Sequence, residues 1–369
     1  VIGSAIHCIM LIFMENKDRF NVMELTFDQK YNAVVNRDSS FEGIFVTAVK
    51  TTKIFCRPTC RAKKPKPENV LFFDSPREAM MNGFRPCKLC SPLALPGETP
   101  EAIRNLLQEL HEKPYVRIKD SDLISRGVEP SQVRRWFKKN HRLTFQSYQR
   151  MLRINNAYQN IAGGEMVTEA AFGSGFNSLS GFNTRFQSVF GEAPSHTVGK
   201  SIINMIRIPT PLGPMFACAT DNGICMLEFT DRRMLETEFR DLRRYLNAEI
   251  LPGENEHLVL LQKELDEYFN GTRKEFTVRL DAPGTPFQKA VWECLLKIPY
   301  GETRSYKMQA ILLGRPLAVR AVASANGCNR ISIVIPCHRV IGENGDLTGY
   351  GGGLVRKKWL LEHEKKSFL

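Results

Sequence analysis

The spacing of apolar residues changes several times along the chain, and each change predicts a different kind of element. Residues 41–49 form a run rich in β-branched and aromatic side chains, which favours a strand. Apolar residues between 103 and 110 are spaced i, i+3, i+4 and i+7, which predicts an amphipathic helix. Between residues 202 and 281, helical patterns alternate with short strand-like runs at 205–208, 215–219 and 225–229. This alternation predicts a small α/β unit, so the chain is expected to contain several domains.

Two helical units follow one another in the region 131–190. The segment 131–153 carries seven basic residues and no acidic one, and Val133 and Phe137 give its helix an apolar inner face. In the second unit a glycine-rich turn, Gly173–Phe176, joins two helices, the second with a phenylalanine every four residues. This pattern predicts two helix-turn-helix units in series. Their outward polar positions are candidates for reading bases in the major groove, with plain solvated faces as the alternative. These positions are Gln132, Arg135, Asn183 and Arg185.

A third helix-turn-helix pattern leads into the most reactive part of the sequence. Thr285 and Pro286 are typical of a helix start, because threonine caps a helix and proline fits its first turn. Residues 305–313 and 316–326 have helical patterns, and the apolar run 331–335 predicts a strand. A nucleophile beside a base is typical of an activated thiol. Directly after the apolar run stand Pro336, Cys337, His338 and Arg339.

The composition narrows the functional classes. The chain has 369 residues, of which 43% are hydrophobic and 24% charged, which indicates about two to four globular domains. Lysine and arginine outnumber aspartate and glutamate by 51 to 39, and the net charge of +12 favours a polyanionic partner. No apolar run approaches the roughly 20 residues of a membrane span, so no membrane partner is expected. Ten cysteines without a secretory signal pattern predict a reducing, cytoplasmic location, where clustered cysteines indicate metal binding or catalysis.

Four of the cysteines form two close pairs. Cys56 and Cys60 make a Cys-x3-Cys pair, and Cys87 and Cys90 make a Cys-x2-Cys pair. Two such pairs are typical of a tetrahedral zinc site, because each short loop supplies two thiolates to one side of the ion. Four unrelated buried thiols are the alternative. Ten lysines and arginines face only three acidic residues in the region 50–90, so these cations are expected to bind phosphates, to offset the thiolate charge, or both.

The sequence around these cysteines resembles the zinc domain of the Ada family of DNA repair proteins. The resemblance lies in Thr51–Arg61 and Gly83–Cys87. It implies that the four cysteines hold one Zn²⁺, that no organic cofactor is needed, and that Cys56 accepts a methyl group from a DNA methylphosphotriester. It also implies DNA contacts by nearby polar and basic residues, namely Thr52, Arg57, Arg61, Lys63 and Arg85.

The two helical units in series resemble the AraC-type DNA-binding domain, most clearly where the second unit ends at residues 190–195. Glu129 is a departure from that family, in which serine is the usual cap of the first unit. The C-terminal part resembles the O6-alkylguanine-DNA alkyltransferases. That resemblance lies in 301–306, 318–323, 335–339 and the glycine-rich loop 349–353.

The resemblance to the alkyltransferases implies a set of roles around Cys337. Cys337 takes the alkyl group, His338 accepts the thiol proton through a water, and Glu364 orients His338. The remaining implied roles belong to Tyr306, which donates a hydrogen bond to the departing guanine, Arg320, which fills the gap left by the flipped base, and Asn329, which braces the turn before Cys337. Gln309 departs from the family, in which an apolar residue is usual at that position.

These resemblances cover residues 20–366 and imply a multidomain α+β protein. For the first residues two interpretations are open, a segment foreign to the protein or a buried N-terminal strand. The expected parts are an N-terminal extension at 1–19 that is foreign to the protein, a small zinc-binding α/β domain at 20–92, an all-α double helix-turn-helix domain at 100–198, an α/β ribonuclease-H-like subdomain at 202–281 and a winged-helix-like alkyltransferase domain at 282–369.

The implied function is double. Cys337 repairs O6-methylguanine and O4-methylthymine stoichiometrically, and methylation of Cys56 switches on sequence-specific DNA binding and transcription of the alkylation response. The expected partners are double-stranded DNA, both alkylated and promoter, and RNA polymerase during activation, with the protein a monomer on the bacterial nucleoid. One alternative is a zinc-dependent transcription factor whose C-terminal domain senses alkylation without repair. Another is a cysteine protease or other Cys-His hydrolase, which leaves three helix-turn-helix patterns unexplained.

Overall fold

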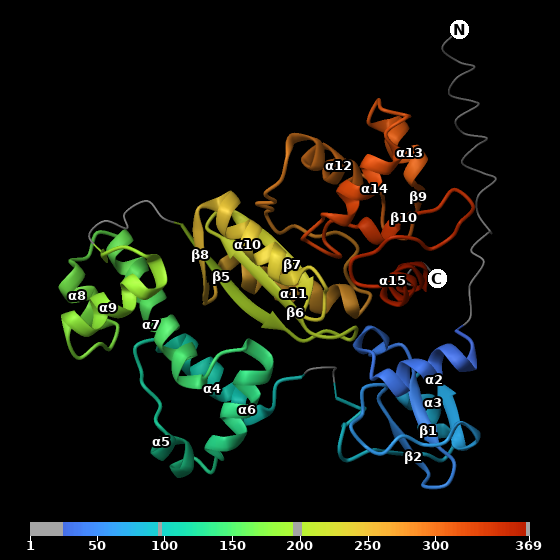
Figure 1. The fold of residues 1–369 in the computed structure, drawn as a ribbon, viewed down its shortest axis with the longest axis horizontal. Coiled ribbons are helices and arrows are strands. Elements are labelled where there is room, and N and C mark those ends of the chain that lie inside the picture. Colours follow the sequence, from blue (N-terminus) through green and yellow to red (C-terminus); the bar gives the residue numbers. More distant parts are fainter. Residues whose placement is uncertain (1–24, 95–97, 195–200, 367–369) are drawn as a thin grey trace. The chain divides into compact units, whose positions relative to one another are not determined.

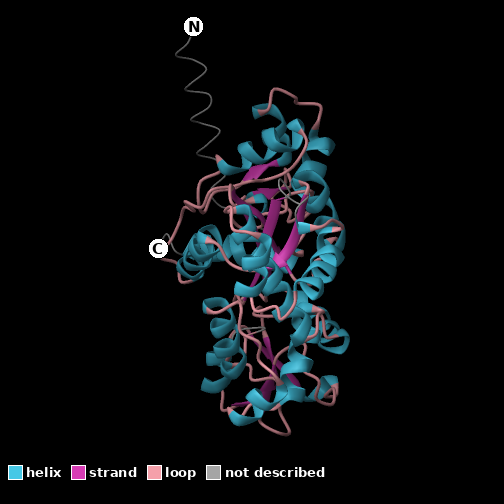
Figure 2. Cartoon of the chain, turned by 90° about the vertical axis from the view of Figure 1, so that its left-hand side faces the viewer, coloured by secondary structure: helices cyan, strands magenta, loops and turns pink. Residues whose placement is uncertain are grey.

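The structure, a computed structural model, describes residues 25–94, 98–194 and 201–366. It is a multidomain α+β protein, as predicted, and the strands of the described residues form three small sheets (Figures 1 and 2). The expected extension at 1–19 lies outside the described residues. Within the ranges that the structure covers, no helix is both long and apolar enough to cross a bilayer.

The N-terminal part is a four-stranded sheet with two α-helices. The strand order is β3-β1-β2-β4, and only the β2–β4 pair is parallel. Ala48, Phe55, Ala79 and Phe84 are buried together in its core. The strand predicted at 41–49 is shorter than expected, because its first residue belongs to a 3-10 turn. The elements are α2 (Phe27–Asn36), η1 (Ser39–Phe41), β1 (Val46–Val49), β2 (Ile54–Cys56), η2 (Pro67–Asn69), β3 (Val70–Phe73), α3 (Pro76–Met81) and β4 (Arg85–Pro86).

The middle part consists of helices (Figure 1). Ile103, Leu106 and Leu110 are buried on one face of α4, which confirms the predicted amphipathic helix. Helices α5 and α6 form the first helix-turn-helix, α8 and α9 the second, and α7 runs between them. Gly175 in the second turn has φ +78°, and a Cβ there would lie 2.2 Å from the carbonyl oxygen of Tyr115, so the turn requires glycine. The elements are α4 (Glu101–Glu112), α5 (Asp120–Ser125), α6 (Pro130–His141), α7 (Phe145–Ala162), α8 (Val167–Gly173) and α9 (Leu179–Phe190).

The next part is a four-stranded sheet with two helices packed against it (Figure 1). Its order is β7-β6-β5-β8, with β8 parallel to β5 and the other pairs antiparallel. The three strand-like runs of the sequence are confirmed as β5, β6 and β7. The elements are β5 (Ser201–Ile208), β6 (Met215–Thr220), β7 (Gly223–Phe229), α10 (Leu235–Leu246), β8 (Ala248–Pro252) and α11 (Glu256–Phe269).

The C-terminal part contains the third helix-turn-helix, made of α13 and α14. The predicted helix start at Thr285 is confirmed, since the backbone N–H of Gln288 donates to its hydroxyl at 3.3 Å. The elements are α12 (Pro286–Leu296), β9 (Arg304–Ser305), α13 (Tyr306–Leu312), α14 (Val319–Gly327), η4 (Cys337–Arg339), β10 (Val340–Ile341) and α15 (Leu354–Lys366).

The strand predicted at 331–335 is wrong. The run forms a turn in which Ile333 has φ +73°. The hydroxyl of Ser332 donates to the buried carboxylate of Glu228 at 2.5 Å and so ties the turn to the small sheet. A β-branched residue rarely adopts a left-handed conformation, so the surrounding packing must hold it there. Cys337 therefore begins a 3-10 helix and does not follow a strand.

Candidate functional site

The four clustered cysteines of the N-terminal part form a metal-binding group. The Sγ atoms of Cys56, Cys60, Cys87 and Cys90 all lie within 4.8 Å of one another. Tetrahedral zinc with Zn–S bonds of about 2.3 Å needs sulfurs roughly 3.8 Å apart, so the group fits one ion. Hydrogen bonding between two of these thiols raises the pKa of Cys56 and lowers that of Cys90 to about 6. The predicted four-cysteine zinc site is confirmed.

Strand pairing brings the two cysteine pairs together. β2 ends at Cys56, β4 ends just before Cys87, and the two strands run parallel with Phe55 opposite Pro86. The backbone N–H of Cys87 donates to the carbonyl of Phe55 at 3.0 Å. Because paired strands lie about 4.8 Å apart, the first cysteine of each pair emerges beside the other.

A partly buried ion pair holds the first cysteine loop. Nη1 of Arg57 lies 3.1 Å from Oε2 of Glu42, and Nε of Arg57 donates to the carbonyl of Cys90 at 3.0 Å. The hydroxyl of Thr59 also donates to Glu42, which is only 8% exposed. Glu42 was not predicted from the sequence, although its place as the last acid before a strongly basic region could have indicated it.

The predicted DNA contacts of this part fall into two groups. Arg57 points inward to its carboxylate partner, and its DNA contact stays a prediction. The others are exposed on the loops and strand ends around the cysteines, where a DNA strand can reach them. They are Thr52, Arg61, Lys63 and Arg85.

In the C-terminal part, a buried amide holds the Cys337 thiol. Cys337 is 7% exposed, and Asn329 is 1% exposed. Nδ2 of Asn329 donates to Sγ of Cys337 at 3.2 Å and to the carbonyl of Ile335 at 2.9 Å. One side chain therefore fixes both the thiol and the turn before it, and a donor to sulfur favours the thiolate.

His338 is bound on one side by a buried carboxylate. Its Nε2 lies 2.8 Å from Oε1 of Glu364, and both side chains are fully buried. Nε and Nη2 of Arg339 donate to the two oxygens of Glu364 at 2.8 and 3.0 Å. Burial raises the pKa of Glu364, but His338 and Arg339 lower it by more, so Glu364 is a carboxylate.

The pair of His338 and Glu364 also fixes where the imidazole proton lies. Burial lowers the pKa of His338 despite the carboxylate, so the ring is neutral near pH 7. A carboxylate only accepts hydrogen bonds, so Nε2 carries the proton and Nδ1 keeps a lone pair. Among the described residues Nδ1 has no hydrogen-bond partner, so it is the nitrogen that can accept a proton.

Lys357 is a buried cation that was not predicted from the sequence. Its Nζ donates to the carbonyl of Val340 and, at 2.6 Å, to that of Thr348. Burial lowers the pKa of Lys357 to about 8, while the charge of Cys337 acts to raise it. The two groups therefore interact electrostatically. Its position could have indicated it, because it precedes Glu364 by two helical turns on α15 and so shares its face.

Tyr306 and Arg320 lie on the two helices of the third helix-turn-helix. The hydroxyl of Tyr306 lies 3.1 Å from the carbonyl oxygens of Thr348 and Gly349, in the loop that Lys357 also contacts. Burial raises the pKa of Tyr306, so the hydroxyl stays protonated and can donate. Arg320 is the second residue of α14 and is exposed.

The predicted base readers lie on the second helix of each helix-turn-helix in the middle part. Gln132 and Arg135 are exposed on α6, Arg185 is exposed on α9, and Asn183 is half-buried. Nε of Arg135 donates to the carbonyl of Ser131 at 3.2 Å, within its own helix. Base contacts by these four residues stay predictions.

Four family models match the chain, one after another. They are the metal binding domain of Ada at 29–92, a helix-turn-helix domain at 125–200, the ribonuclease-like domain of 6-O-methylguanine DNA methyltransferase at 206–282 and the DNA binding domain of the same methyltransferase at 286–366.

Curated relatives match both the whole chain and its C-terminal half. The chain is 33% identical over 358 residues to the bifunctional transcriptional activator/DNA repair enzyme Ada of Escherichia coli, covering 93% of this chain and 98% of that protein. It is 46% identical over 164 residues to the methylated-DNA–protein-cysteine methyltransferase of Mycobacterium bovis, covering 44% of this chain and 93% of that protein. A crystal structure of Mycobacterium tuberculosis OGT in complex with DNA is 41% identical, with a TM-score of 0.38, and covers 45% of this chain and 93% of that one. The first match runs through both chains almost from end to end.

Proposed function

Because the chain belongs to the Ada family of bifunctional transcriptional activators and DNA repair enzymes, we propose that it transfers methyl groups from DNA to two of its own cysteines. Cys337 takes the methyl group of O6-methylguanine or O4-methylthymine, and Cys56 takes that of a methylphosphotriester. The observation that carries the proposal is the neutral His338, the residue next to Cys337 in sequence. Glu364 binds Nε2 of its ring, which leaves Nδ1 able to accept a proton.

The reaction at Cys337 needs one proton transfer and one displacement. Nδ1 of His338 takes the thiol proton through a water, and Glu364 stabilises the imidazolium that results. The thiolate attacks the methyl carbon, so a sulfur–carbon bond forms while the bond from carbon to O6 breaks. The bonding electrons go to guanine, and the proton on His338 then neutralises the base. Tyr306 donates a hydrogen bond to the departing base. A thioether has no easy way back, so each molecule acts once at this site.

The base must leave the duplex to reach Cys337. A stacked guanine cannot bring its O6 to a buried sulfur, and flipping it out costs a few kcal/mol. Arg320 is exposed at the start of α14, which supports its role in filling the gap that the flipped base leaves. Asn329 keeps the thiol aimed while the base enters.

The zinc site supplies the second acceptor. The four cysteines would hold Zn²⁺, which keeps its thiolate ligands deprotonated at neutral pH. Cys56 is half-buried whereas Cys60 is buried, which supports Cys56 as the acceptor of the first pair. Its sulfur bonds to the methyl carbon as the carbon–oxygen bond of the triester breaks, and the phosphate regains its negative charge.

Methylation of Cys56 changes the charge of the site that faces DNA. Four thiolates and one divalent ion carry a formal charge of −2, and a neutral thioether in place of one thiolate leaves −1. At an effective dielectric of ~20 and a distance of ~8 Å, that change is worth about 2 kcal/mol per nearby phosphate before screening. The helix-turn-helix part then binds promoter DNA, and the protein recruits RNA polymerase as a monomer on the cytoplasmic nucleoid.

Site-resolved methyl mapping tests the proposal. A duplex with O6-methylguanine should place one methyl group on the peptide of Cys337, and a methylphosphotriester duplex should place one on the peptide of Cys56. Cys337→Ser should abolish only the first transfer, and Cys56→Ala only the second together with methylation-dependent promoter binding. Cys328→Ala, at a half-buried thiol outside both sites, is the control. An unmethylated Cys337 beside an intact lesion would leave only a transcription factor that senses alkylation without repair.

A further inference from the structure

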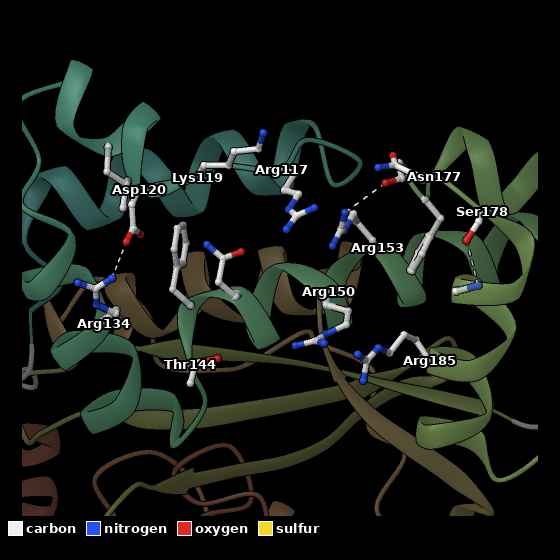
Figure 3. Close-up of a pocket in the computed structure, with 16 residues that line it drawn as sticks. Arg117, Lys119, Asp120, Arg134, Thr144, Arg150, Arg153, Asn177, Ser178 and Arg185 are labelled. Atoms are coloured by element: carbon white, nitrogen blue, oxygen red, sulfur yellow. Dashed lines mark hydrogen bonds and ion pairs between the residues drawn. The ribbon is translucent and has the colours of Figure 1, made fainter.

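Six cationic side chains line a cavity of about 490 Å³ in the helical middle part. Figure 3 places Arg150 and Arg153 of α7 between Arg134 of α6 and Arg185 of α9, so the cavity lies between the two helix-turn-helix units. One acidic residue lines it, Asp120, and this carboxylate is paired with Arg134 at 2.5 Å. The lining cations are Arg117, Lys119, Arg134, Arg150, Arg153 and Arg185.

Four of these arginines repel one another. Burial lowers the pKa of Arg150 and Arg153, and neighbouring guanidinium groups lower both further. The neighbours are Arg185 and Arg117 for Arg150, and Arg117 and Arg150 for Arg153. Because like charges in one cavity destabilise the folded chain, their presence is best explained by an anion that binds there.

The guanidinium groups of α7 are held in place by neutral partners. Nη1 of Arg153 donates to the carbonyl of Gly175 at 3.2 Å, and its guanidinium lies 5.2 Å from the ring centre of Phe176. Nε of Arg153 is buried and has no hydrogen-bond partner in the part of the chain that the structure describes. Nη2 of Arg150 donates to the hydroxyl of Ser147 at 3.2 Å. These contacts position the side chains but do not neutralise their positive charge.

We propose that Arg117, Arg150, Arg153 and Arg185 bind one phosphate of the DNA backbone, in the stretch between the two segments that α6 and α9 contact. Guanidinium groups match phosphate oxygens in pairs, which makes arginine well suited to this ligand. Two recognition helices that enter successive major grooves are about 34 Å apart along the duplex, and the backbone crosses between them. The contact fixes the register of the protein on DNA and reads no base. This inference rests on the proposed function only in that the helix-turn-helix part is taken to bind duplex DNA with both units.

The test measures how DNA binding by the full-length, zinc-loaded protein depends on salt. The variants are Arg117→Gln and Arg150→Gln, and the control is Arg240→Gln, which removes an exposed cation from α10. A duplex of random sequence is titrated between about 50 and 200 mM salt, where each lost phosphate contact makes the plot of log K against log salt less steep by about 0.9. A variant that combines both substitutions should bind roughly tenfold more weakly at low salt. This loss should be equal on every sequence, and the control should match the wild type.

Two readouts separate this site from a structural role and from a site for free phosphate. Without DNA, the variants should keep or raise the thermal midpoint because repulsion is relieved, and they should still transfer a methyl group to Cys337. A lower midpoint together with weaker binding would overturn the proposal, as would an unchanged slope or a loss confined to one sequence. Inorganic phosphate, compared with chloride at equal ionic strength, should stabilise the wild type more than the two variants, because the same guanidinium groups bind any phosphate oxygen. If the wild type gains more while the slope stays unchanged, the site takes a free anion and the proposal fails.

Failure of the proposed function would look different. In that case the methylated protein would select no sequence from a random duplex library, while the change in salt slope on random DNA would still be measurable and would still support the phosphate site.

Discussion

Nε2 of His338 lies 2.8 Å from Oε1 of Glu364, and neither side chain is exposed to solvent. The same carboxylate accepts two hydrogen bonds from Arg339. Glu364 is therefore shared between a base that must stay neutral and a cation that must stay paired. Its removal should affect reactivity and stability together.

Glu364→Gln should slow methyl transfer to Cys337 by roughly 10²–10³-fold, because the imidazolium loses its stabilising carboxylate. It should also lower the free energy of unfolding by about 3–5 kcal/mol, because Arg339 keeps a buried charge without its partner. Single-turnover transfer and urea unfolding measure the two effects. Glu362→Gln on the same helix is the control, since that residue lies outside the site and pairs with Lys358 at 3.8 Å. A variant that keeps the wild-type rate would show that His338 needs no carboxylate.

Stability should fall as the pH drops through the range in which histidine normally titrates. Burial lowers the pKa of His338, so the folded protein binds fewer protons here than the unfolded chain. This contribution is fully present above the ordinary pKa of about 6.5 and is lost as the pH falls toward and through the lower folded value. Urea unfolding between about pH 5 and pH 8 should show the decline, and His338→Gln should flatten it. An equal decline in the variant would assign the effect to other groups.

Lys357→Met should make Cys337 less reactive without a large change in side-chain volume. The substitution removes a buried cation that interacts with the thiol, so less thiolate is present at neutral pH. Alkylation of Cys337 by iodoacetamide should slow about tenfold, the lower end of what an opposite charge nearby achieves. Lys365→Met, at an exposed position of the same helix, should leave the rate unchanged. Equal reactivity in both variants would remove Lys357 from the site.

Asn329→Ala should lower the free energy of unfolding by about 1–3 kcal/mol, because the carbonyl of Ile335 loses its buried donor. Methyl transfer should slow as well, since the sulfur loses its donor. Asn329→Asp should slow transfer more than alanine does, because a carboxylate next to sulfur opposes the thiolate. If the two variants transfer at the same rate, Asn329 acts only by bracing the turn. Asn270→Ala at an exposed helix end is the stability control.

Glu42→Gln should weaken zinc binding by about 10–100-fold, the usual effect of losing a residue that orients the metal ligands. Glu42 holds Arg57 and Thr59 in the loop between the first two cysteines. Competition with a chelator measures the affinity, and Glu68→Gln at an exposed position is the control. Unchanged affinity would mean that the cysteine loop keeps its shape without the ion pair.

Features with a short sequence period were predictable. The apolar face of α4 and the phenylalanines of α9 repeat every three to four residues, and each is buried as expected. The cysteine pairs were predictable for the same reason, because the two ligands of each pair lie within one loop. In these cases neighbouring residues decide the structure.

Features that depend on distant partners were missed. The run 331–335 has the composition of a strand, but Ser332 bonds to Glu228, which is 104 residues away in sequence. Gln309 stands in a helix where an apolar residue is expected, and it is satisfied by Asn326, whose Nδ2 donates to its side-chain oxygen at 2.7 Å. A local pattern carries no information about either partner.

The two sulfurs proposed as methyl acceptors lie in unrelated scaffolds, Cys56 at the end of a β-strand in a thiol cluster and Cys337 at the start of a 3-10 helix. Each sulfur can be methylated once, and methylation of one does not alter the residues that activate the other. A population of these molecules in a damaged cell therefore sorts into four chemical forms. Their proportions report the numbers of backbone lesions and base lesions separately until newly made protein dilutes them.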